Sequence, residues 1–448
     1  MSEHLFRRPL FLDRWLTHWI FIAIILVCGI YSAWDKYETS IAIDFYQMWG
    51  IGNAMKASDH SLPTPYFAKS QYGKILDAIS EATPDERLQV ANKTNHQIYD
   101  FGLEPTASPL LFALFALFPR GYSQSYGIFL ACDLSLFAFS IVLLFKRFSS
   151  LSTFLVLLFG IILFEPFRSD LNLGNLNLFQ FSAVSIGLYY SEKVRSHDAS
   201  FASRGIFLAL IAFGTLIKPN LALIAIAFAA PLLLPIRREE IIRLLATLVT
   251  SVFLLLAIPC IYFKSFTVWS HWLQYLTTAG KLNFGLFSGN LSTTAVIAFV
   301  SGQPSDSLKI VILVLSAIFG TVAMFCSTPR SLRCLLGCSD SSIAIAMIVT
   351  LAISPLVWWH YYLILLVPII WLVNVGPMFS VPSALGVLSL LLASNIISLF
   401  DRNLYLYNVY IVPSCWIPLL VGVLLACRAQ LDVHNPSSRQ HEMLRSNS

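Results

Sequence analysis

Four long runs of this chain contain no charged residue, and they constrain what it can fold into more than any other feature. The runs are Trp19–Trp34, Ser149–Phe164, Leu244–Phe263 and Val381–Phe400. A helix rises about 1.5 Å per residue, so about 20 residues cross a hydrocarbon core about 30 Å thick. Each run is that long or nearly so. We therefore expect an all-α chain that crosses a membrane several times.

The overall composition supports a membrane protein. Hydrophobic residues make up 57% of the 448 positions, charged residues only 12%, and the mean hydropathy is +0.72. A soluble domain has about 25% charged residues, because its surface must face water. The net charge of +5 is small, and the Lys and Arg residues flank apolar segments instead of forming a patch. This pattern gives no indication of nucleic-acid binding.

The apolar segments predict about twelve spans, which would make residues 1–427 one polytopic transmembrane helical bundle. Ser108–Pro119 is apolar but too short to cross, so we expect a re-entrant or interfacial piece there. Residues 428–448 are polar and are expected to form a disordered cytoplasmic tail. The expected spans lie near 15–34, 123–145, 151–166, 175–191, 205–217, 219–236, 241–263, 308–327, 341–357, 361–376, 380–400 and 411–427.

The basic residues predict how the bundle is oriented. Positive residues near the ends of spans favour the cytoplasmic side. Both termini are then inside, and residues 35–106 form an outer loop that continues into the re-entrant start. Short amphipathic helices such as Tyr66–Ala82 are expected in that loop, and 264–307 forms a second outer loop. The expected location is a cell membrane, specifically a bacterial inner membrane. The basic residues that agree with this orientation are Arg7, Arg8, Arg14, Lys146, Arg147, Lys193, Arg195, Arg237, Arg238, Arg330, Arg333 and Arg428.

No cofactor is expected from the sequence. The chain has eight cysteines, and none lies in a loop that we place outside, which argues against a disulfide framework. Cys334 and Cys338 share a short basic loop, but two further metal ligands are missing there. No P-loop, dinucleotide-binding glycine pattern or zinc motif is present. We therefore expect neither a metal nor a nucleotide cofactor.

Unusual polar residues gather on the predicted outer side. Each has an ordinary explanation: Asp44 could cap a helix, Lys218 could extend to the membrane interface, and Asn175 could stabilise a turn. Ionisable residues at membrane level are costly, however, so several on one side indicate function. The set consists of Asp44, Asn175, Asn177, Lys218, Asn290, Trp358 and His360.

These residue types match one kind of chemistry. A carboxylate can accept the proton of a sugar hydroxyl. Lysine and histidine can neutralise a departing phosphate, while asparagine and tryptophan are suited to sugar hydroxyls and sugar faces. A transporter or flippase of a lipid-linked or small polar substrate is the alternative. It would be expected to show inverted repeats and charge near the midplane, and we find neither pattern in the sequence.

Six short motifs occur in an order that resembles a known family. They are Asp44–Tyr46 with Trp49, Ser108–Leu111, Gly174–Asn177, Lys218–Pro219, Gly289–Ser292, and Ser354–Pro355 continuing to Trp358, His360 and Tyr361. At these residues the chain resembles glycosyltransferase family 87 of the GT-C superfamily, which includes bacterial α-mannosyltransferases that use polyprenyl-phosphate mannose. The family's usual Gly-Gln-x-Asn stands here as Gly174-Asn175-Leu176-Asn177.

The resemblance implies a GT-C-like fold and an inverting glycosyltransferase that works on the outer face. The donor would be a polyprenyl-phosphate sugar, carrying mannose or a related hexose, and the acceptor a glycolipid or glycan. Asp44 would be the general base, and Lys218 and His360 would bind the donor phosphate. The sugar or acceptor contacts would come from Asn175, Asn177, Trp358 and Asn290.

Overall fold

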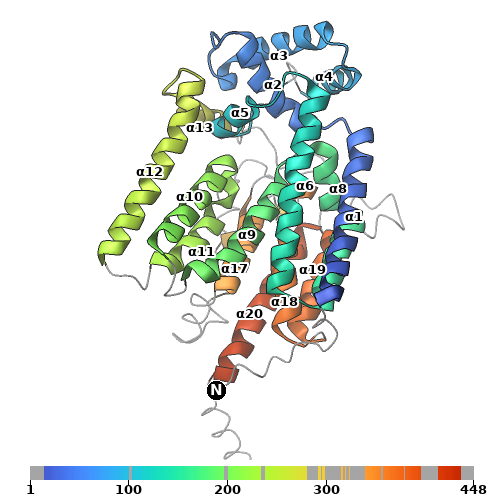
Figure 1. The fold of residues 1–448 in the computed structure, drawn as a ribbon, viewed down its shortest axis with the longest axis vertical. Helices are drawn as coiled ribbons and strands as arrows, with labels where there is room; N and C mark the ends of the chain where they lie inside the picture. Colours follow the sequence, from blue (N-terminus) through green and yellow to red (C-terminus); the bar gives the residue numbers. More distant parts are fainter. Residues whose placement is uncertain are drawn as a thin grey trace, which may run out of the picture.

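The computed structural model describes most of the chain. Its described residues are 15–99, 103–195, 200–233, 238–279, 291–293, 295–297, 314–315, 318, 322, 339–354, 357–377, 379–394 and 412–434. Every regular element within these ranges is a helix (Figure 1), which confirms the all-α prediction for this part of the chain. Asn290 and most of the expected span at 308–327 lie outside the described residues.

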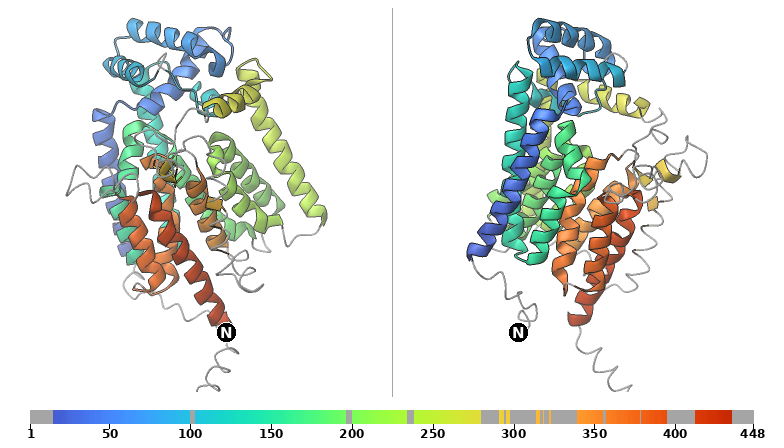
Figure 2. Two further views of the ribbon diagram at one scale, coloured as in Figure 1. Left: turned by 180° about the vertical axis from the view of Figure 1, so that it is seen from behind. Right: turned by 90° about the vertical axis from the view of Figure 1, so that its right-hand side faces the viewer.

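The molecule consists of a bundle of apolar helices with a helical cap over one end (Figures 1 and 2). The cap contains α2 (Ile43–Ala57), α3 (Pro65–Ala82), α4 (Glu86–Ile98), α5 (Pro109–Phe115) and α13 (Val268–Ala279). The bundle contains α1 (Trp15–Thr39), α6 (Tyr122–Arg147), α7 (Leu151–Ile162), α8 (Glu165–Leu173), α9 (Asn177–Arg195), α10 (Phe201–Ile217), α11 (Ala222–Leu233), α12 (Arg238–Tyr262), α17 (Ser339–Ile353), α18 (Leu366–Val375), α19 (Val381–Ala393) and α20 (Trp416–His434).

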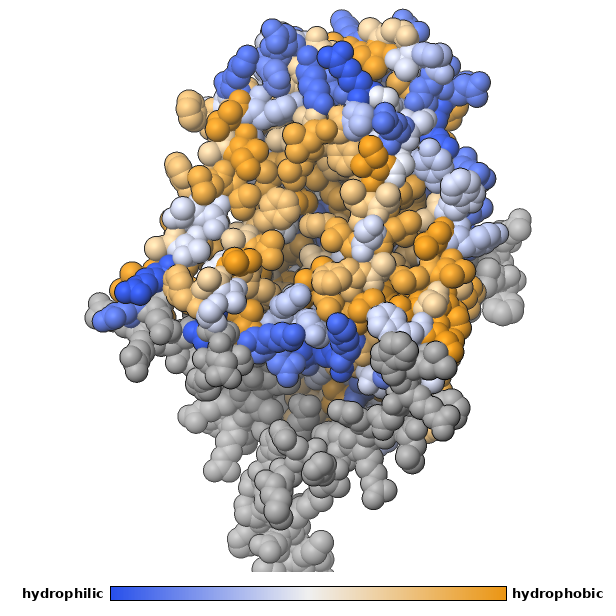
Figure 3. Space-filling model, in the orientation of Figure 1, coloured by the Kyte–Doolittle hydropathy of each residue, from blue (hydrophilic) through white to orange (hydrophobic). Residues whose placement is uncertain are grey.

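The surface is divided as a membrane protein requires. Figure 3 shows polar residues over the cap, a broad hydrophobic band below it, and further polar residues beyond the band. Fully apolar side chains are strongly exposed in this band; on α12, for example, Val249 is 65% and Phe253 68% exposed. Such side chains are stable where lipid, and not water, surrounds them. The cap therefore lies at one membrane face.

The described residues contain four helices that are long and apolar enough to cross a membrane alone: Thr17–Thr39, Tyr122–Arg147, Ile241–Tyr262 and Val412–Ala429. The remaining expected spans within the described residues coincide with apolar helices that are shorter or less apolar, including α10, α17 and α19. The expected total of twelve spans remains a prediction.

One expected span is broken. We expected a single crossing at 151–166, but α7 ends at Ile162 and α8 begins at Glu165, with a bend of 47° between them. Glu165 and Pro166 occupy the first turn of α8. Proline lacks the N–H that would continue a helix, and it fits best in the first turn of a new one. Because of this bend, α8 runs toward the cap in a different direction from α7.

Short polar residues set several helix starts. Ser108, Ser150, Ser200 and Ser380 each precede a helix, and each hydroxyl accepts a hydrogen bond from the backbone N–H three residues later. Such caps satisfy donors that the first helical turn leaves free. The segment that begins after Ser108 forms only the seven-residue α5. This length confirms that Ser108–Pro119 contains no spanning helix.

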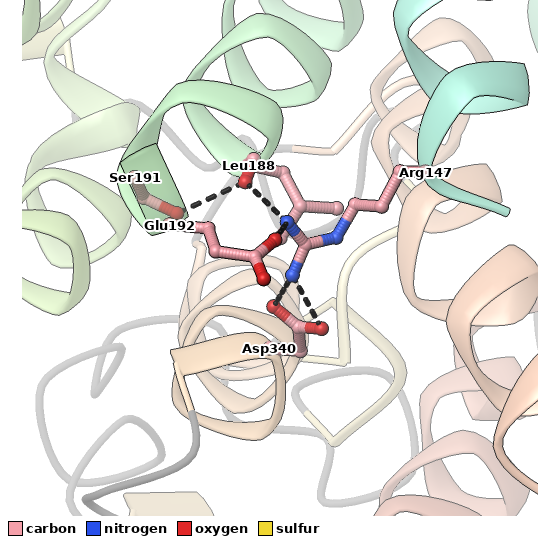
Figure 4. A network of polar contacts seen from close by, with 5 residues as sticks. All are labelled: Arg147, Leu188, Ser191, Glu192 and Asp340. Atoms are coloured by element: carbon pink, nitrogen blue, oxygen red, sulfur yellow. Dashed lines mark hydrogen bonds and ion pairs between the residues drawn. The ribbon is translucent and has the colours of Figure 1, made fainter. Parts of the chain in front are cut away.

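The helices alternate in direction, as expected. Both α6 and α9 begin near the cap and end at the opposite face, where Arg147 and Lys193 lie. At that face Arg147 joins three helices (Figure 4): its guanidinium donates to Asp340 of α17 at 2.7 and 2.8 Å, and to Glu192 of α9 at 2.8 Å. It also donates to the carbonyl of Leu188 at 3.0 Å. A bidentate arginine of this kind fixes the relative positions of these helices.

The start of α1 and the end of α20 lie at the face opposite the cap. α1 starts there and rises to α2, and α20 descends from the cap side toward the same face (Figure 2). α20 also runs past Arg428 to His434, so the start of the expected disordered tail is helical. The residues after His434 lie outside the described part.

The orientation gives a testable prediction. In a cysteine-free background, Lys93→Cys on exposed α4 should react with a membrane-impermeant maleimide on intact cells. Lys193→Cys, near the end of α9, should react only after the membrane is permeabilised, because five basic loops favour a cytoplasmic position there. Labelling of Lys193→Cys on intact cells would show that the orientation is reversed.

Candidate active site

Asp44 lies where the cap meets the bundle. Ala42 is the N-cap of α2, and no side chain caps the helix, so Asp44 is a first-turn residue and not a cap. A carboxylate in a first turn is favoured by the positive end of the helix dipole. The helix is fixed by Trp49, whose indole N–H donates to the Pro119 carbonyl at 3.1 Å. Phe45 packs among aromatic rings, and the centre of its ring lies 5.2 Å from the centre of the Tyr126 ring.

Gly174 allows a second segment to come close to Asp44. This residue ends α8 with a φ of +64°, a conformation that residues with a Cβ rarely adopt. A Cβ at this position would lie 2.7 Å from the Cβ of Phe45. Nearby, the Ser40 hydroxyl donates to the carbonyl of Asn172, which ties the start of α2 to the end of α8. The close approach brings Asn175, the next residue, against Asp44.

The side chain of Asn175 is the centre of the site. Its amide nitrogen donates to Asp44 Oδ2 at 2.6 Å and contacts His360 Nε2 at 3.3 Å. Its amide oxygen accepts from Lys218 Nζ at 3.0 Å and from the Leu176 backbone N–H at 2.6 Å. Lysine and a backbone N–H can only donate, so the orientation of this amide is determined. One side chain thus links a carboxylate, an ammonium group and an imidazole.

The contact with Asn175 determines the form of His360. The amide nitrogen is a donor, so Nε2 must be an acceptor and the ring proton must lie on Nδ1. His360 is therefore neutral in this arrangement, where we expected a cationic phosphate ligand. It is 2% exposed, and within the described structure its Nδ1 has no hydrogen-bond partner. A buried N–H without a partner is unfavourable, and a ligand oxygen would satisfy it.

Asp170 fixes the backbone and side chain that follow Asn175. It accepts hydrogen bonds from the backbone N–H of Leu178 at 2.9 Å and from the Asn177 amide nitrogen at 2.9 Å. The Asn177 amide also donates to the oxygen of Asn175 at 3.1 Å. Asp170 and Asn177 are each only 1% exposed. Asn177 therefore holds Asn175 in place, and the sugar contact expected of Asn177 from the sequence remains a prediction.

Lys218 lies in the break between α10 and the short helix η2 (Pro219–Leu221). Its ammonium lies 5.3 Å from the centre of the Tyr361 ring, a favourable cation–π distance. Burial lowers the pKa of Lys218 to about 8, although the charges of Asp170 and Asp44 act in the opposite direction. Burial also raises the pKa of Asp44, against the hydrogen bond from Asn175 and the charge of Lys218. Both groups are thus moved toward neutral pH.

The structure brings together four of the residues predicted from the sequence, namely Asp44, Asn175, Lys218 and His360. Trp358 lies two residues before His360, at the start of η4 (Trp359–Leu365). Two contributors were not assigned a role from sequence, Asp170 and Tyr361. Both residues lie in or beside the motifs of the sequence, which could have pointed to them. Spacing along the sequence, however, does not show which side chains face the site. Asp44, Asn175 and Lys218 are partly exposed, so a substrate can reach them.

The donor types here do not form a metal centre. Within the described residues, no group of three or more His, Cys, Asp and Glu side chains could hold a metal ion. The site instead pairs one carboxylate with one ammonium across an amide. Such a pair can move a proton and stabilise a developing negative charge.

The fold and the candidate site together define a helical membrane protein with a partly buried cluster of polar and charged side chains where the cap meets the bundle. Residues 103–357, more than half of the chain, match the family model of glycosyltransferase family 87. The chain therefore belongs to this family and is a glycosyltransferase. A search of the curated proteins and a search of the solved structures find no match.

The family match includes Asn175 and Lys218 but begins after Asp44 and ends before His360. The hydrogen bonds of Asn175 connect these two outer residues to the matched region. The structure thus extends the site beyond the part of the chain that the family comparison covers.

The close approach at Gly174 gives a prediction. Gly174→Ala should reduce both thermal stability and transfer activity, because the left-handed conformation costs about 1–2 kcal/mol with a Cβ and the new methyl group would press on Phe45. Gly214→Ala is the matched control, since its Cβ would meet no atom nearer than 4.0 Å. The melting temperatures of the two purified variants can be compared directly. Equal melting temperatures would show that the α2–α8 contact can relax.

Proposed function

We propose that this protein transfers a hexose, mannose or a close relative, from a polyprenyl-phosphate donor to a hydroxyl of a glycan or glycolipid. The transfer takes place on the outer face of the membrane and inverts the configuration at the sugar carbon. The observation that carries the proposal is the Asn175 amide, which holds Asp44 and Lys218 on its two ends. A general base and a cation are the two groups that such a transfer needs.

On the acceptor side, Asp44 acts as the general base. Its carboxylate takes the proton of the acceptor hydroxyl as the oxygen attacks the sugar carbon. Burial raises the pKa of Asp44, which makes its carboxylate a stronger base than that of an ordinary aspartate. The hydrogen bond from Asn175 fixes the direction of the carboxylate. Its other oxygen is left to receive the proton.

On the donor side, Lys218 acts on the leaving group. The bond between the sugar carbon and the phosphate oxygen breaks, and the electron pair leaves with the phosphate. Negative charge grows on that oxygen, so an ammonium beside it binds the transition state more strongly than the ground state. His360 contributes as a neutral group, since its Nδ1–H can donate to a phosphate oxygen.

A lipid-linked donor fits the position of the site better than a nucleotide sugar. Lys218 directly follows α10 and His360 is the second residue of η4, so both lie at the ends of apolar helices. A prenyl chain in the hydrophobic band would bring its phosphate to these helix ends. A nucleotide would need a polar surface to hold its base and ribose, and in the described residues this site is bordered by apolar helices on the membrane side.

The first test supplies the donor. Purified protein in detergent or nanodiscs receives either polyprenyl-phosphate hexose or the corresponding nucleotide hexose, and sugar transfer is followed by radiolabel. We expect transfer only from the lipid-linked donor. Activity with the nucleotide sugar alone, in a preparation free of other enzymes, would refute the donor assignment.

Asp44→Asn tests the general base. The amide keeps the shape and still accepts one hydrogen bond, but it cannot take the acceptor proton, and loss of a general base typically costs about 10²–10⁴-fold in rate. Asp35→Asn, at the exposed outer end of α1, is the control for loss of one carboxylate on this face. Near-normal turnover by a folded Asp44→Asn protein would remove Asp44 from the mechanism.

The pH dependence of kcat/KM tests the proposed roles of Asp44 and Lys218. Transfer requires ionised Asp44 and protonated Lys218, so kcat/KM should rise with pH through a value above that of a free aspartate. It should fall again as Lys218 loses its proton near pH 8. Lys218→Arg should remove the fall at high pH and keep the rise, because an arginine stays protonated up to a pKa above about 12. A fall at the same pH in Lys218→Arg would assign the high-pH limb to another group.

A further inference from the structure

Lys218 lies at a break in the chain that leaves a neighbouring carbonyl without its helical partner. Pro219 has no N–H and keeps the residue before it out of the helical conformation, so α10 ends at Ile217. In a continuous helix the Leu221 N–H would donate to the Ile217 carbonyl, but here it donates to the Lys218 carbonyl at 3.0 Å. Ile217 is buried, so its carbonyl needs another donor.

The cap supplies that donor. The Ser108 hydroxyl, which also caps α5, donates to the Ile217 carbonyl at 3.2 Å. Ser108 is buried, and the chain before it is itself fixed. Tyr66 of α3 and Trp272 of α13 donate to the carbonyls of the two preceding residues, at 2.9 and 3.1 Å. The end of α10 is thus tied to the cap one residue before Lys218.

A second contact holds the turn after Lys218. The Gln180 amide nitrogen of α9 donates to Oδ1 of Asn220 at 2.9 Å, and Gln180 is only 1% exposed. Gln180 lies one helical turn after Asn177, on the same face of α9. Asn177 in turn donates to the Asn175 oxygen that accepts from Lys218. One face of α9 therefore supports both ends of the turn that carries Lys218.

We propose that Ser108 and Gln180 are positioning residues for Lys218: they hold the backbone of its turn, so that the ammonium meets the leaving phosphate in one place. This inference rests on the proposed function and needs no contact of either residue with substrate. A lysine side chain is long and flexible, and a cation stabilises a transition state best when it is fixed before the reaction. Asn175 fixes the ammonium, and the two other contacts fix the backbone that carries it.

Gln180→Met removes the hydrogen-bond donor and keeps the length of the side chain. The probes are polyprenyl-phosphate mannose and octyl mannoside, and both transfer and slow hydrolysis of the donor by water are measured. Both reactions break the bond between the sugar carbon and the phosphate oxygen. A misplaced ammonium should therefore lower kcat of each about ten- to a hundredfold, while KM for octyl mannoside stays unchanged. Asn220→Leu removes the same hydrogen bond from its other end and should have the same effect.

Double variants separate positioning from general support of the fold. If Gln180 acts through Lys218, Gln180→Met should lower the rate no further in a Lys218→Ala protein, assayed at higher enzyme concentration. A protein with both Gln180→Met and Asn220→Leu should be no slower than either single variant. Thr215→Val is the matched control. Its hydroxyl donates to the Ile211 carbonyl of its own helix at 2.9 Å, so its loss should change neither rate.

Ser108 is tested by loss and rescue. Ser108→Ala should lower both rates, because the buried Ile217 carbonyl loses its donor, and Ser108→Thr should keep them, because threonine retains the hydroxyl. Ser200→Ala removes the serine cap from the other end of α10. This variant is the control for loss of a helix cap, and it should leave both rates unchanged.

Several results would overturn the inference. These are unchanged rates in folded Gln180→Met and Asn220→Leu proteins, a further loss when Gln180→Met is added to Lys218→Ala, or a Ser108→Thr protein as slow as Ser108→Ala. A wild-type protein that neither transfers nor hydrolyses polyprenyl-phosphate mannose would refute the proposed function, and the inference with it.

Discussion

The reaction centre depends on one amide group. Asn175 places its oxygen on an ammonium and its nitrogen on a carboxylate, 3.0 Å and 2.6 Å away. The amide and the two charged groups thereby fix one another's orientation. A flipped amide would place its NH2 group against the ammonium and its oxygen against the carboxylate, and both contacts are unfavourable. Asp44 and Lys218 do not form a direct ion pair in this arrangement. A direct pair would neutralise both groups and hide them from substrates, whereas a pair separated by an amide leaves each with a free side.

Holding two charges at the edge of an apolar bundle requires support from outside the pair. Asp170 provides it, with a carboxylate that accepts from Asn177 and from the backbone, and with a charge that favours protonated Lys218. The neutral tautomer of His360 fits the same requirement. A second cation beside Lys218 would be unfavourable in the absence of a bound anion, but a neutral N–H donor is not.

Sequence reasoning located the elements better than it located the contacts. The uncharged runs predicted where helices lie, since burial in lipid is a local requirement that a short segment reveals. The bend between Ile162 and Glu165 was missed, because a run of uniform hydrophobicity does not show where a helix changes direction. Asp44, Asn175, Lys218 and His360 were selected from motifs and do meet. The contacts of Asn177 and the protonation of His360 could not be predicted, because each depends on which neighbours a side chain finds in the fold.

The site is divided between the cap and the bundle, and this division suits the proposed reaction, whose two substrates differ greatly in polarity. Asp44 belongs to α2 in the polar cap, where the proposed hydroxyl-rich acceptor would be solvated, and Lys218 and His360 belong to the ends of apolar helices of the bundle. Each substrate can therefore approach through the medium that dissolves it. In the proposed reaction the reacting atoms meet beside Asn175, which the turn at Gly174 brings against Asp44 of α2. A glycine at 174 is needed for that turn, because any side chain there would push the two halves of the site apart. The separation of polar and apolar surfaces that makes the protein a membrane protein is thus the same separation that the proposed substrates, one hydroxyl-rich and one lipid-linked, require of the site.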